Sequence, residues 1–170
     1  MNRSWFLAAA TLATLLVGCG KEQEEPGDGS GTAPFPTAAT LGDQVVLTAS
    51  EYLAAEPYAS ANRSRGERQV AMCKACHSLD EGGPNMIGPP LFGLFGSQVG
   101  TRSGFEYSAV MRNADFVWTP EALDAWLAQP GRFLPGNRMT FAGVFDREDR
   151  EGLIAYLLER TTAESQDQQR

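Results

Sequence analysis

A Cys-x-x-Cys-His motif is the clearest chemical signal in this 170-residue sequence, where it reads Cys73-Lys74-Ala75-Cys76-His77. Residues three apart lie on one face of a helix, so both sulfurs can reach a common partner with the imidazole beside them. The pattern is that of c-type haem attachment, in which two thiols bond the porphyrin. We therefore predict one covalently bound heme c, attached through Cys73 and Cys76, with His77 as an axial ligand of the iron.

Three other uses of this motif agree less well with the sequence. A thioredoxin-like redox pair needs a flanking βαβ pattern, and none is visible. A zinc site needs four ligands, and beyond Cys19 only Cys73, Cys76 and His77 remain. A disulfide across two residues would be strained. Because the chain has one histidine, sites built from several imidazoles are excluded as well.

The second axial ligand must come from another part of the chain, and it is not a histidine. Four methionines follow the initiator. Met72 abuts the motif on the wrong side, and Met86 lies in the loop that should return beneath the ring. Met111 and Met139 are both distant enough. A Pro-Gly turn before Met139 favours it, whereas a core-packing role suits Met111 better.

The N-terminus has the layout of an exported lipoprotein. One positive charge, Arg3, precedes an apolar run over residues 5–17, which is too short to span a bilayer. The run ends in Leu-Val-Gly-Cys, which resembles the bacterial lipobox, with Cys19 as the lipidated residue. We predict a signal peptide over residues 1–18 and a lipid anchor on the periplasmic face of the cell membrane. An uncleaved signal anchor is the alternative.

Charge and composition divide the remaining chain. Residues 20–61 carry a net charge of −6 and are rich in Glu, Gly, Pro and Ala, whereas residues 62–160 carry only −1. We therefore predict a lipidated Cys and acidic flexible linker over residues 19–61, with at most a short helix. A globular domain over residues 62–160 and a polar tail over residues 161–170 follow. The formal charge of −7 speaks against nucleic-acid binding.

Three helices are predicted in the globular domain. The first covers residues 67–76. Thr119 and Pro120 have the residue types of an N-cap and first helical position and start the second. Asp146 caps the third. The apolar stripes of the last two helices contain Leu123, Trp126, Leu127, Leu153, Ile154, Leu157 and Leu158.

Residues 66–158 resemble class I cytochrome c of the mitochondrial and bacterial type. The matches in register are residues 73–77, 83–85, 88, 89, 91, 93–96, 104, 105, 107, 118, 130, 135, 136, 139, 141–143 and 153–157. The resemblance implies an all-α fold of three to five helices around one covalently bound haem. It also implies that His77 and Met139 are the axial ligands.

The resemblance further implies roles for residues around the ligands. The Pro89 carbonyl would accept the Nδ1 proton of the histidine. Tyr107 and Trp118 would hydrogen-bond the haem propionates. Asn137 would lie beside the methionine strand, and Trp126 stands where the family has a tyrosine that donates to the methionine sulfur.

Four further positions depart from the family pattern. Pro90 replaces an asparagine, and Ser97 replaces the arginine near the propionates, so one counter-charge is missing; the sequence does not show whether Arg102 replaces it. Met111 replaces the asparagine of an internal water network, and Val70 replaces an aromatic residue. These changes leave the ligands intact and bear on the potential.

A low-spin haem with two protein ligands exchanges single electrons and has no open position for a substrate. We therefore predict a monomeric, membrane-tethered electron carrier and not an enzyme. Its expected partners are redox complexes of a respiratory or photosynthetic chain, with a cytochrome bc-type donor and a terminal oxidase or other acceptor. The alternatives are a haem peroxidase or nitric-oxide-reacting enzyme with a displaceable Met139, and a haem subunit dedicated to one dehydrogenase.

Overall fold

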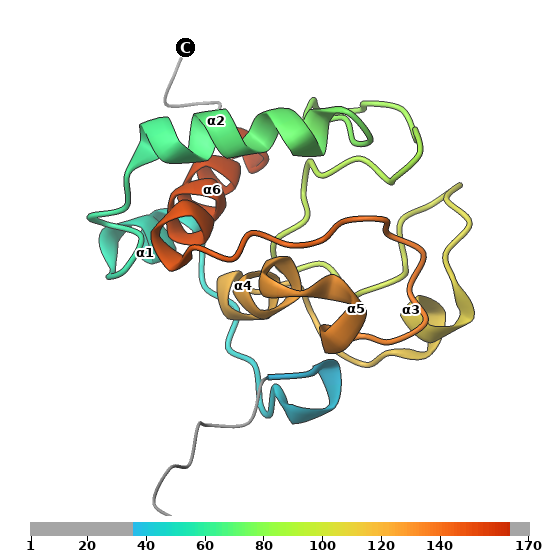
Figure 1. The fold of residues 1–170 in the computed structure, drawn as a ribbon. Coiled ribbons are helices and arrows are strands. Elements are labelled where there is room, and N and C mark those ends of the chain that lie inside the picture. The colour runs from blue at the N-terminus through green and yellow to red at the C-terminus, as the bar shows by residue number, and fades with distance from the viewer. Residues whose placement is uncertain (1–35, 164–170) are drawn as a thin grey trace, which may run out of the picture. The chain divides into compact units, whose positions relative to one another are not determined.

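Six α-helices and one 3₁₀ helix form the regular structure of residues 36–163, which are the residues that the structure, a computed structural model, describes (Figure 1). They are the 3₁₀ helix Ala38–Thr40, α1 Ala49–Ala54, α2 Arg63–Lys74, α3 Ala109–Asn113, α4 Pro120–Ala128, α5 Pro130–Phe133 and α6 Arg147–Arg160. No strand forms in this range; an isolated antiparallel bridge joins Gln98 and Val117. The predicted all-α class is confirmed.

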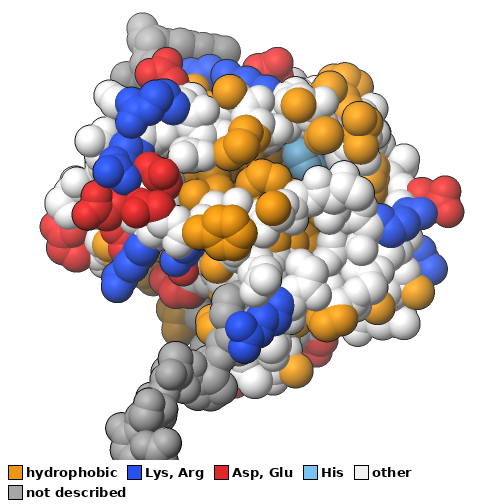
Figure 2. Space-filling view, in the orientation of Figure 1, with side chains coloured by type: hydrophobic (Ala, Val, Ile, Leu, Met, Phe, Trp, Pro, Cys, Tyr) orange, Lys and Arg blue, Asp and Glu red, His pale blue; other side chains and the backbone are white. Residues whose placement is uncertain are grey.

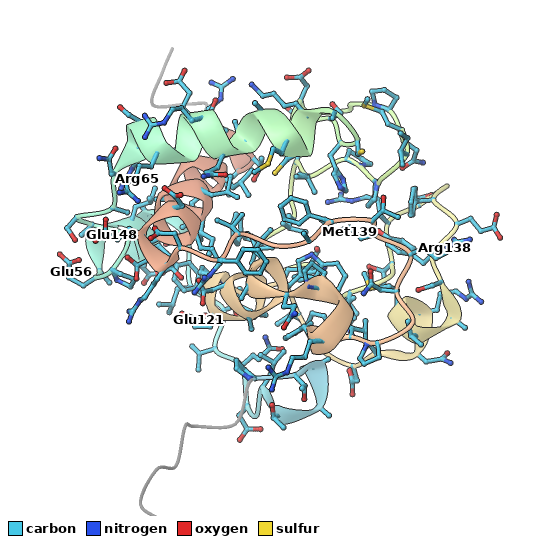
Figure 3. The ribbon with its side chains drawn as sticks, viewed as in Figure 1. Glu56, Arg65, Glu121, Arg138, Met139 and Glu148 are labelled. Carbon is cyan, nitrogen blue, oxygen red and sulfur yellow. The ribbon has the colours of Figure 1, made fainter. Side chains whose placement is uncertain are left out.

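Helices α2 and α6 cross at two glycines (Figure 1). A Cβ atom added to Gly66 would lie 2.0 Å from the carbonyl oxygen of Gly152, so the two backbones approach as closely as they do only because both residues lack side chains. Arg65, labelled in Figure 3, pairs from the start of α2 with Asp146 at 3.1 Å and Asp149 at 2.9 Å. The crossing fixes the end of α2, which carries the Cys-x-x-Cys-His motif.

Helix α2 begins earlier than predicted. The side chain of Asn62 accepts a hydrogen bond from the backbone of Arg65 at 3.1 Å and caps the helix, so Gly66 lies inside it. The predicted start at residue 67 is wrong because glycine was taken as a boundary, whereas here it serves the helix crossing. The helix ends at Lys74, two residues before the predicted end.

The starts of α4 and α6 are confirmed. The Thr119 hydroxyl accepts from the backbone of Ala122 at 3.2 Å, with Pro120 at the first helical position. The Asp146 carboxylate accepts from the backbone of Asp149 at 2.9 Å. Every residue of the two predicted apolar stripes is buried, namely Leu123, Trp126, Leu127, Leu153, Ile154, Leu157 and Leu158. Local capping chemistry thus placed these helices correctly.

Aromatic side chains join α4 and α5 to the segment before them. Trp118 contacts Phe116 and Trp126 edge-to-face, with ring centroids 4.9 and 5.6 Å apart. Phe133 of α5 contacts Phe116 and Trp126 in the same way. Such edge-to-face pairs add about 0.5–1.5 kcal/mol each beyond burial of their area. This cluster holds α4 at a fixed place beside the site.

Residues 44–61, which we call the N-terminal strap, pack on the domain. Tyr52 of α1 and Tyr58 are buried among core residues, and the Tyr52 hydroxyl donates to the carbonyl of Val45 at 2.9 Å. Arg63 donates to the carbonyl of Tyr58 at 2.6 Å. The flexible linker predicted up to residue 61 is therefore wrong in its last part, because two tyrosines bury enough apolar surface to order it.

The globular domain also extends beyond its predicted C-terminal end at residue 160. Thr161, assigned to a polar tail, is fully buried, and its carbonyl accepts from the backbone of Gly93 at 2.6 Å. The described residues all belong to one unit, Pro34–Arg170. Within residues 36–163, no helix combines the length and the hydropathy needed to cross a bilayer. The predicted signal peptide and Cys19 lie outside the described residues.

Candidate functional site

The Cys-x-x-Cys-His motif forms the end of α2 and the turn that follows it. The backbone N–H groups of Cys76 and His77 both donate to the carbonyl of Cys73, at 3.0 and 2.9 Å. This turn gathers the two cysteines and the histidine at one place, and both thiols are free of disulfide bonds. Burial raises the pKa of Cys73 to about 11, so at neutral pH this residue is an uncharged thiol.

The imidazole of His77 is held by the loop that returns beneath it. Its Nδ1 lies 2.6 Å from the carbonyl oxygen of Pro89, and a protonated Nδ1 donates to that oxygen. This arrangement leaves Nε2 with its lone pair. Burial lowers the pKa of His77, and the contact with Pro89 acts in the opposite direction. A neutral imidazole with a fixed tautomer is the form that ligates a metal.

Gly88 makes room for that imidazole. A Cβ atom at this position would lie 2.2 Å from Cε1 of His77. Its backbone N–H donates to the carbonyl of Cys76 at 2.9 Å and ties the loop to the motif. The Gly88-Pro89 pair therefore has two uses, since the glycine admits the ring and the proline carbonyl orients it.

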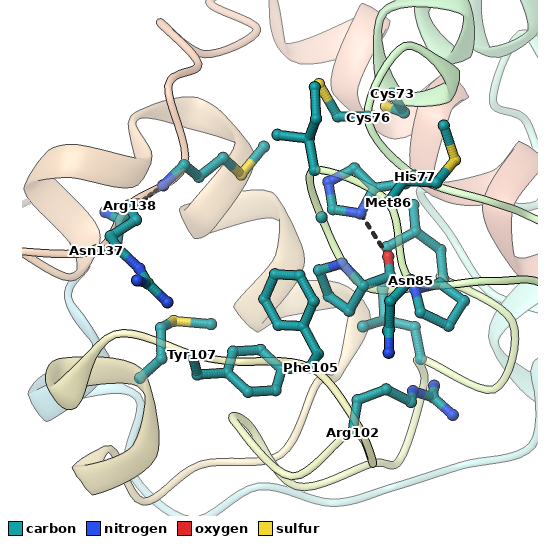
Figure 4. A pocket seen from close by; sticks show the side chains of 18 of the residues that line it. Cys73, Cys76, His77, Asn85, Met86, Arg102, Phe105, Tyr107, Asn137 and Arg138 are labelled. Carbon is teal, nitrogen blue, oxygen red and sulfur yellow. Dashed lines mark hydrogen bonds between the residues drawn. The ribbon is translucent and has the colours of Figure 1, made fainter.

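A cavity of about 830 Å³ opens beside the motif (Figure 4). Cys73, Cys76 and His77 line it together with Met139, and Figure 4 shows the histidine facing the segment of Asn137 and Arg138 across it. The size is in the range of pockets that enclose cofactors, about 300–1,000 Å³. A heme c requires two free thiols and an oriented imidazole on one side of a large cavity. Here the thioether of Met139 lines the same cavity.

Met139 lies in the segment between α5 and α6 (Figure 3). Its backbone N–H donates to the side-chain oxygen of Asn137 at 2.9 Å. The amide nitrogen of Asn137 donates in turn to the carbonyls of Pro130 at 3.0 Å and Leu134 at 2.8 Å. The Asn137 side chain therefore ties the extended segment that carries Met139 to the end of α5 at the cavity wall.

The other three candidate methionines line the same cavity, so lining alone does not select the ligand. Met72 and Met86 are about half exposed, at 48% and 46%. Met111 lies in α3 and packs against the core. Met139 also packs against the core, and Asn137 links its backbone to the carbonyls of Pro130 and Leu134. The backbone N–H of Met111 has only the cap of its own helix, the Ser108 hydroxyl at 3.4 Å.

Two residues expected near the propionates, Tyr107 and Trp118, and one expected near the methionine sulfur, Trp126, also reach the cavity. Tyr107 contacts Phe105 edge-to-face with centroids 4.8 Å apart. Burial raises the pKa of the Tyr107 phenol, with contacts to Arg102 acting in the opposite direction. Each of the three side chains carries one polar hydrogen, and all three belong to the cavity lining.

Arg102 is the site residue that sequence reasoning named only in passing. It lines the cavity, and its guanidinium donates to the carbonyl of Phe92 at 2.6 Å. Ser97, at the position of the missing arginine, instead donates within its own turn to Leu94 at 2.6 Å. The sequence signal for this site residue is a single arginine in a loop of otherwise uncharged residues, 97–104. Its guanidinium brings a positive charge to the cavity lining.

Comparisons with known proteins agree with this site. The chain is 40% identical over 101 residues to a cytochrome c2 of Blastochloris viridis, covering 59% of this chain and 80% of that one. It is 34% identical over 119 residues to a cytochrome c2 of Rhodomicrobium vannielii, covering 70% and 90%. A cytochrome c-type cyt cy of Rhodobacter capsulatus is 46% identical over 85 residues, which are 50% of this chain and 42% of that protein. No family model matches.

An all-α domain whose Cys-x-x-Cys-His turn opens on a haem-sized cavity defines a c-type cytochrome. The chain belongs to the class I cytochrome c family. It carries one covalently bound heme c and is an electron carrier, not an enzyme. Redox proteins are therefore its partners.

Proposed function

We propose that this chain is a membrane-tethered carrier of single electrons, with His77 and Met139 as the axial ligands of its haem iron. The observation that carries the proposal is the shared cavity, which an oriented imidazole and the thioether of a fastened strand both line. Bound haem iron supplies one-electron redox chemistry. With both axial positions filled by the chain, no position remains for a substrate.

A separate hydrogen bond holds each of the two proposed ligands in place. The carbonyl of Pro89 holds the proton on Nδ1 of His77, which leaves the lone pair on Nε2 of a ring that lines the cavity. Asn137 holds the strand of Met139. A thioether ligand favours the reduced iron and so a high potential. The buried aromatic cluster beside the cavity excludes water, which favours the same state.

Separate alanine substitutions of the two core-packed methionines test the ligand assignment. Met139→Ala should keep the attached haem, lose the weak near-infrared sulfur-to-iron band and bind carbon monoxide in the reduced state. Met111→Ala is the matched control and should change neither property. The assignment fails if Met111→Ala loses the band while Met139→Ala keeps it.

We also propose that the domain is exported and tethered through a lipidated Cys19 at the periplasmic face of the cell membrane. The sequence supports this with a short apolar signal that ends in a lipobox-like Leu-Val-Gly-Cys. The tether would comprise residues 20–37, because Ala38 and Leu41 already pack against the core ahead of the strap. A coil of that length spans roughly 23 Å root-mean-square and at most about 60 Å.

A tether of this reach suits a carrier between membrane complexes, for which a cytochrome bc-type donor and a terminal oxidase are the proposed partners. Confinement near the membrane gives an effective concentration on the order of millimolar at such partners. Cys19→Ser should move the cytochrome from the membrane to the soluble periplasmic fraction without changing its haem spectrum. Wild-type protein that is soluble after lysis would contradict the anchor.

A further inference from the structure

An exposed apolar rim borders the cavity on the side of the attachment motif. Met72, Met86 and Ile87 form this apolar rim, with 48%, 46% and 78% of their surfaces exposed. All three line the same cavity as Cys76 and His77. Figure 2 shows hydrophobic side chains gathered beside the one histidine, with Lys, Arg, Asp and Glu mostly further away. Large apolar side chains in this number around a cofactor opening mark an interaction surface.

Few of the residues that line the cavity are charged. Only Arg102, Glu106 and Arg138 carry formal charge among the residues that line the cavity. Both arginines are engaged, Arg102 with the carbonyl of Phe92 and Arg138 with the carbonyl of Glu106. A surface of this kind has little means to steer a charged partner from a distance, because steering needs a field of one sign.

The size of the apolar rim suits a brief encounter. Three side chains at these exposures present on the order of 300 Å² of apolar surface. A stable complex buries roughly 800 Å² on each partner, whereas electron-transfer encounters lie at the low end of interface sizes. A permanent dimer is therefore the weaker fit. An anionic lipid surface fits poorly as well, because it attracts cationic side chains and the three rim residues are uncharged.

We propose that the apolar rim is the docking surface for an electron-transfer protein whose own docking face is uncharged and apolar. The inference rests on the proposed carrier function, since it names the partner chemistry of the same site. Desolvation of Met72, Met86 and Ile87 provides the attraction and brings the partner against the attachment motif. Association through such contacts does not depend on ionic strength.

The test measures second-order electron transfer by stopped flow with the intact holoprotein. The probe is a reduced blue-copper protein whose copper edge carries an uncharged apolar patch, and a second copper protein with an acidic edge serves for comparison. The wild-type rate constant with the apolar probe should change less than about twofold from roughly 10 to 300 mM salt. Ile87→Lys should lower that rate constant by about tenfold, because it places an unpaired charge in the contact.

Val45→Lys is the matched control. Val45 is 72% exposed, but it lies in the N-terminal strap and does not line the cavity. This variant should react at the wild-type rate. Val45→Lys should also keep the haem spectrum and the wild-type rate of reduction by ascorbate, and the haem spectrum of Ile87→Lys reports whether its haem is ligated as in wild type. A wild-type protein that does not cycle with ascorbate and ferricyanide would overturn the carrier function and not only the docking surface.

Four results would overturn the docking proposal. The first is an unchanged rate for Ile87→Lys with the apolar probe. The second is a faster wild-type reaction with the acidic probe that falls more than about tenfold with salt, since this is the signature of electrostatic docking. The third is a wild-type dimer that Ile87→Lys dissociates in sedimentation. The fourth is binding of the Cys19→Ser protein to phosphatidylglycerol vesicles that Ile87→Lys abolishes.

Discussion

The side-chain amide of Gln44 pairs with the backbone of Val117 through two hydrogen bonds. Its oxygen accepts from the Val117 N–H at 2.8 Å, and its nitrogen donates to the Val117 carbonyl at 2.8 Å. Residues 117 and 98 form the isolated bridge, in which Trp118 donates to Ser97 at 2.9 Å. The glutamine thus takes the place of a neighbouring strand and closes the N-terminal strap onto the segment that leads into α4.

Gln44→Ala should therefore destabilise the domain. The backbone N–H of Val117 loses its partner, while its carbonyl keeps the hydrogen bond from the backbone of Thr119 at 3.0 Å, and we expect the free energy of unfolding to fall by about 1–3 kcal/mol. Gln98→Ala is the control, because the Gln98 amide makes an exposed contact of 3.3 Å with Asp115. Its expected loss is below about 0.5 kcal/mol. Denaturant titrations measure both changes, and equal losses would show that the strap is not held by Gln44.

Asn137→Ala should loosen the methionine ligand without removing it. The variant loses the bridge between Met139 and the carbonyls of Pro130 and Leu134. With roughly 1–2 kcal/mol lost, the near-infrared sulfur band should disappear on heating on the order of 5 °C below its wild-type midpoint. A wild-type midpoint for Asn137→Ala would exclude this positioning role.

Gly66→Ala should be among the most damaging small substitutions in the domain. Its methyl group would meet the Gly152 carbonyl oxygen at 2.0 Å, so α2 and α6 must separate. We expect a loss above about 3 kcal/mol in the free energy of unfolding. Gly131→Ala in α5 is the control, because a Cβ there has no atom within 4 Å. Alanine is the better helix former, so that variant should be neutral or slightly more stable.

Tyr58→Phe should alter the alkaline pH dependence of stability. Burial raises the pKa of the Tyr58 phenol, and the carboxylates of Glu121, Asp124 and Glu151 act in the same direction. The folded protein therefore holds this proton more tightly, and the resulting stabilisation is complete below pH 10 and lost as pH rises. Between pH 9 and pH 11 wild type should lose about 1.4 kcal/mol more than Tyr58→Phe. Contributions of the other tyrosines and lysines are common to both proteins. Parallel curves would contradict the assignment to Tyr58.

Several features of this protein were determined by the sequence alone. The Cys-x-x-Cys-His spacing indicated a heme c, and the capping residues Thr119 and Asp146 predicted the starts of two helices that the structure confirms. These inferences succeed because each depends on residues within one helical turn, where spacing along the chain determines spacing in space.

Only the tertiary structure decided the rest. The pairing of Gln44 with Val117 joins residues 73 positions apart, and no local pattern indicated that the strap would pack. The sequence likewise did not show that Arg102 lines the cavity or that Met86 and Ile87 stay exposed at its opening. Burial and partnership of such residues depend on which distant segments close over them, because packing is set by the whole core and not by neighbours in sequence.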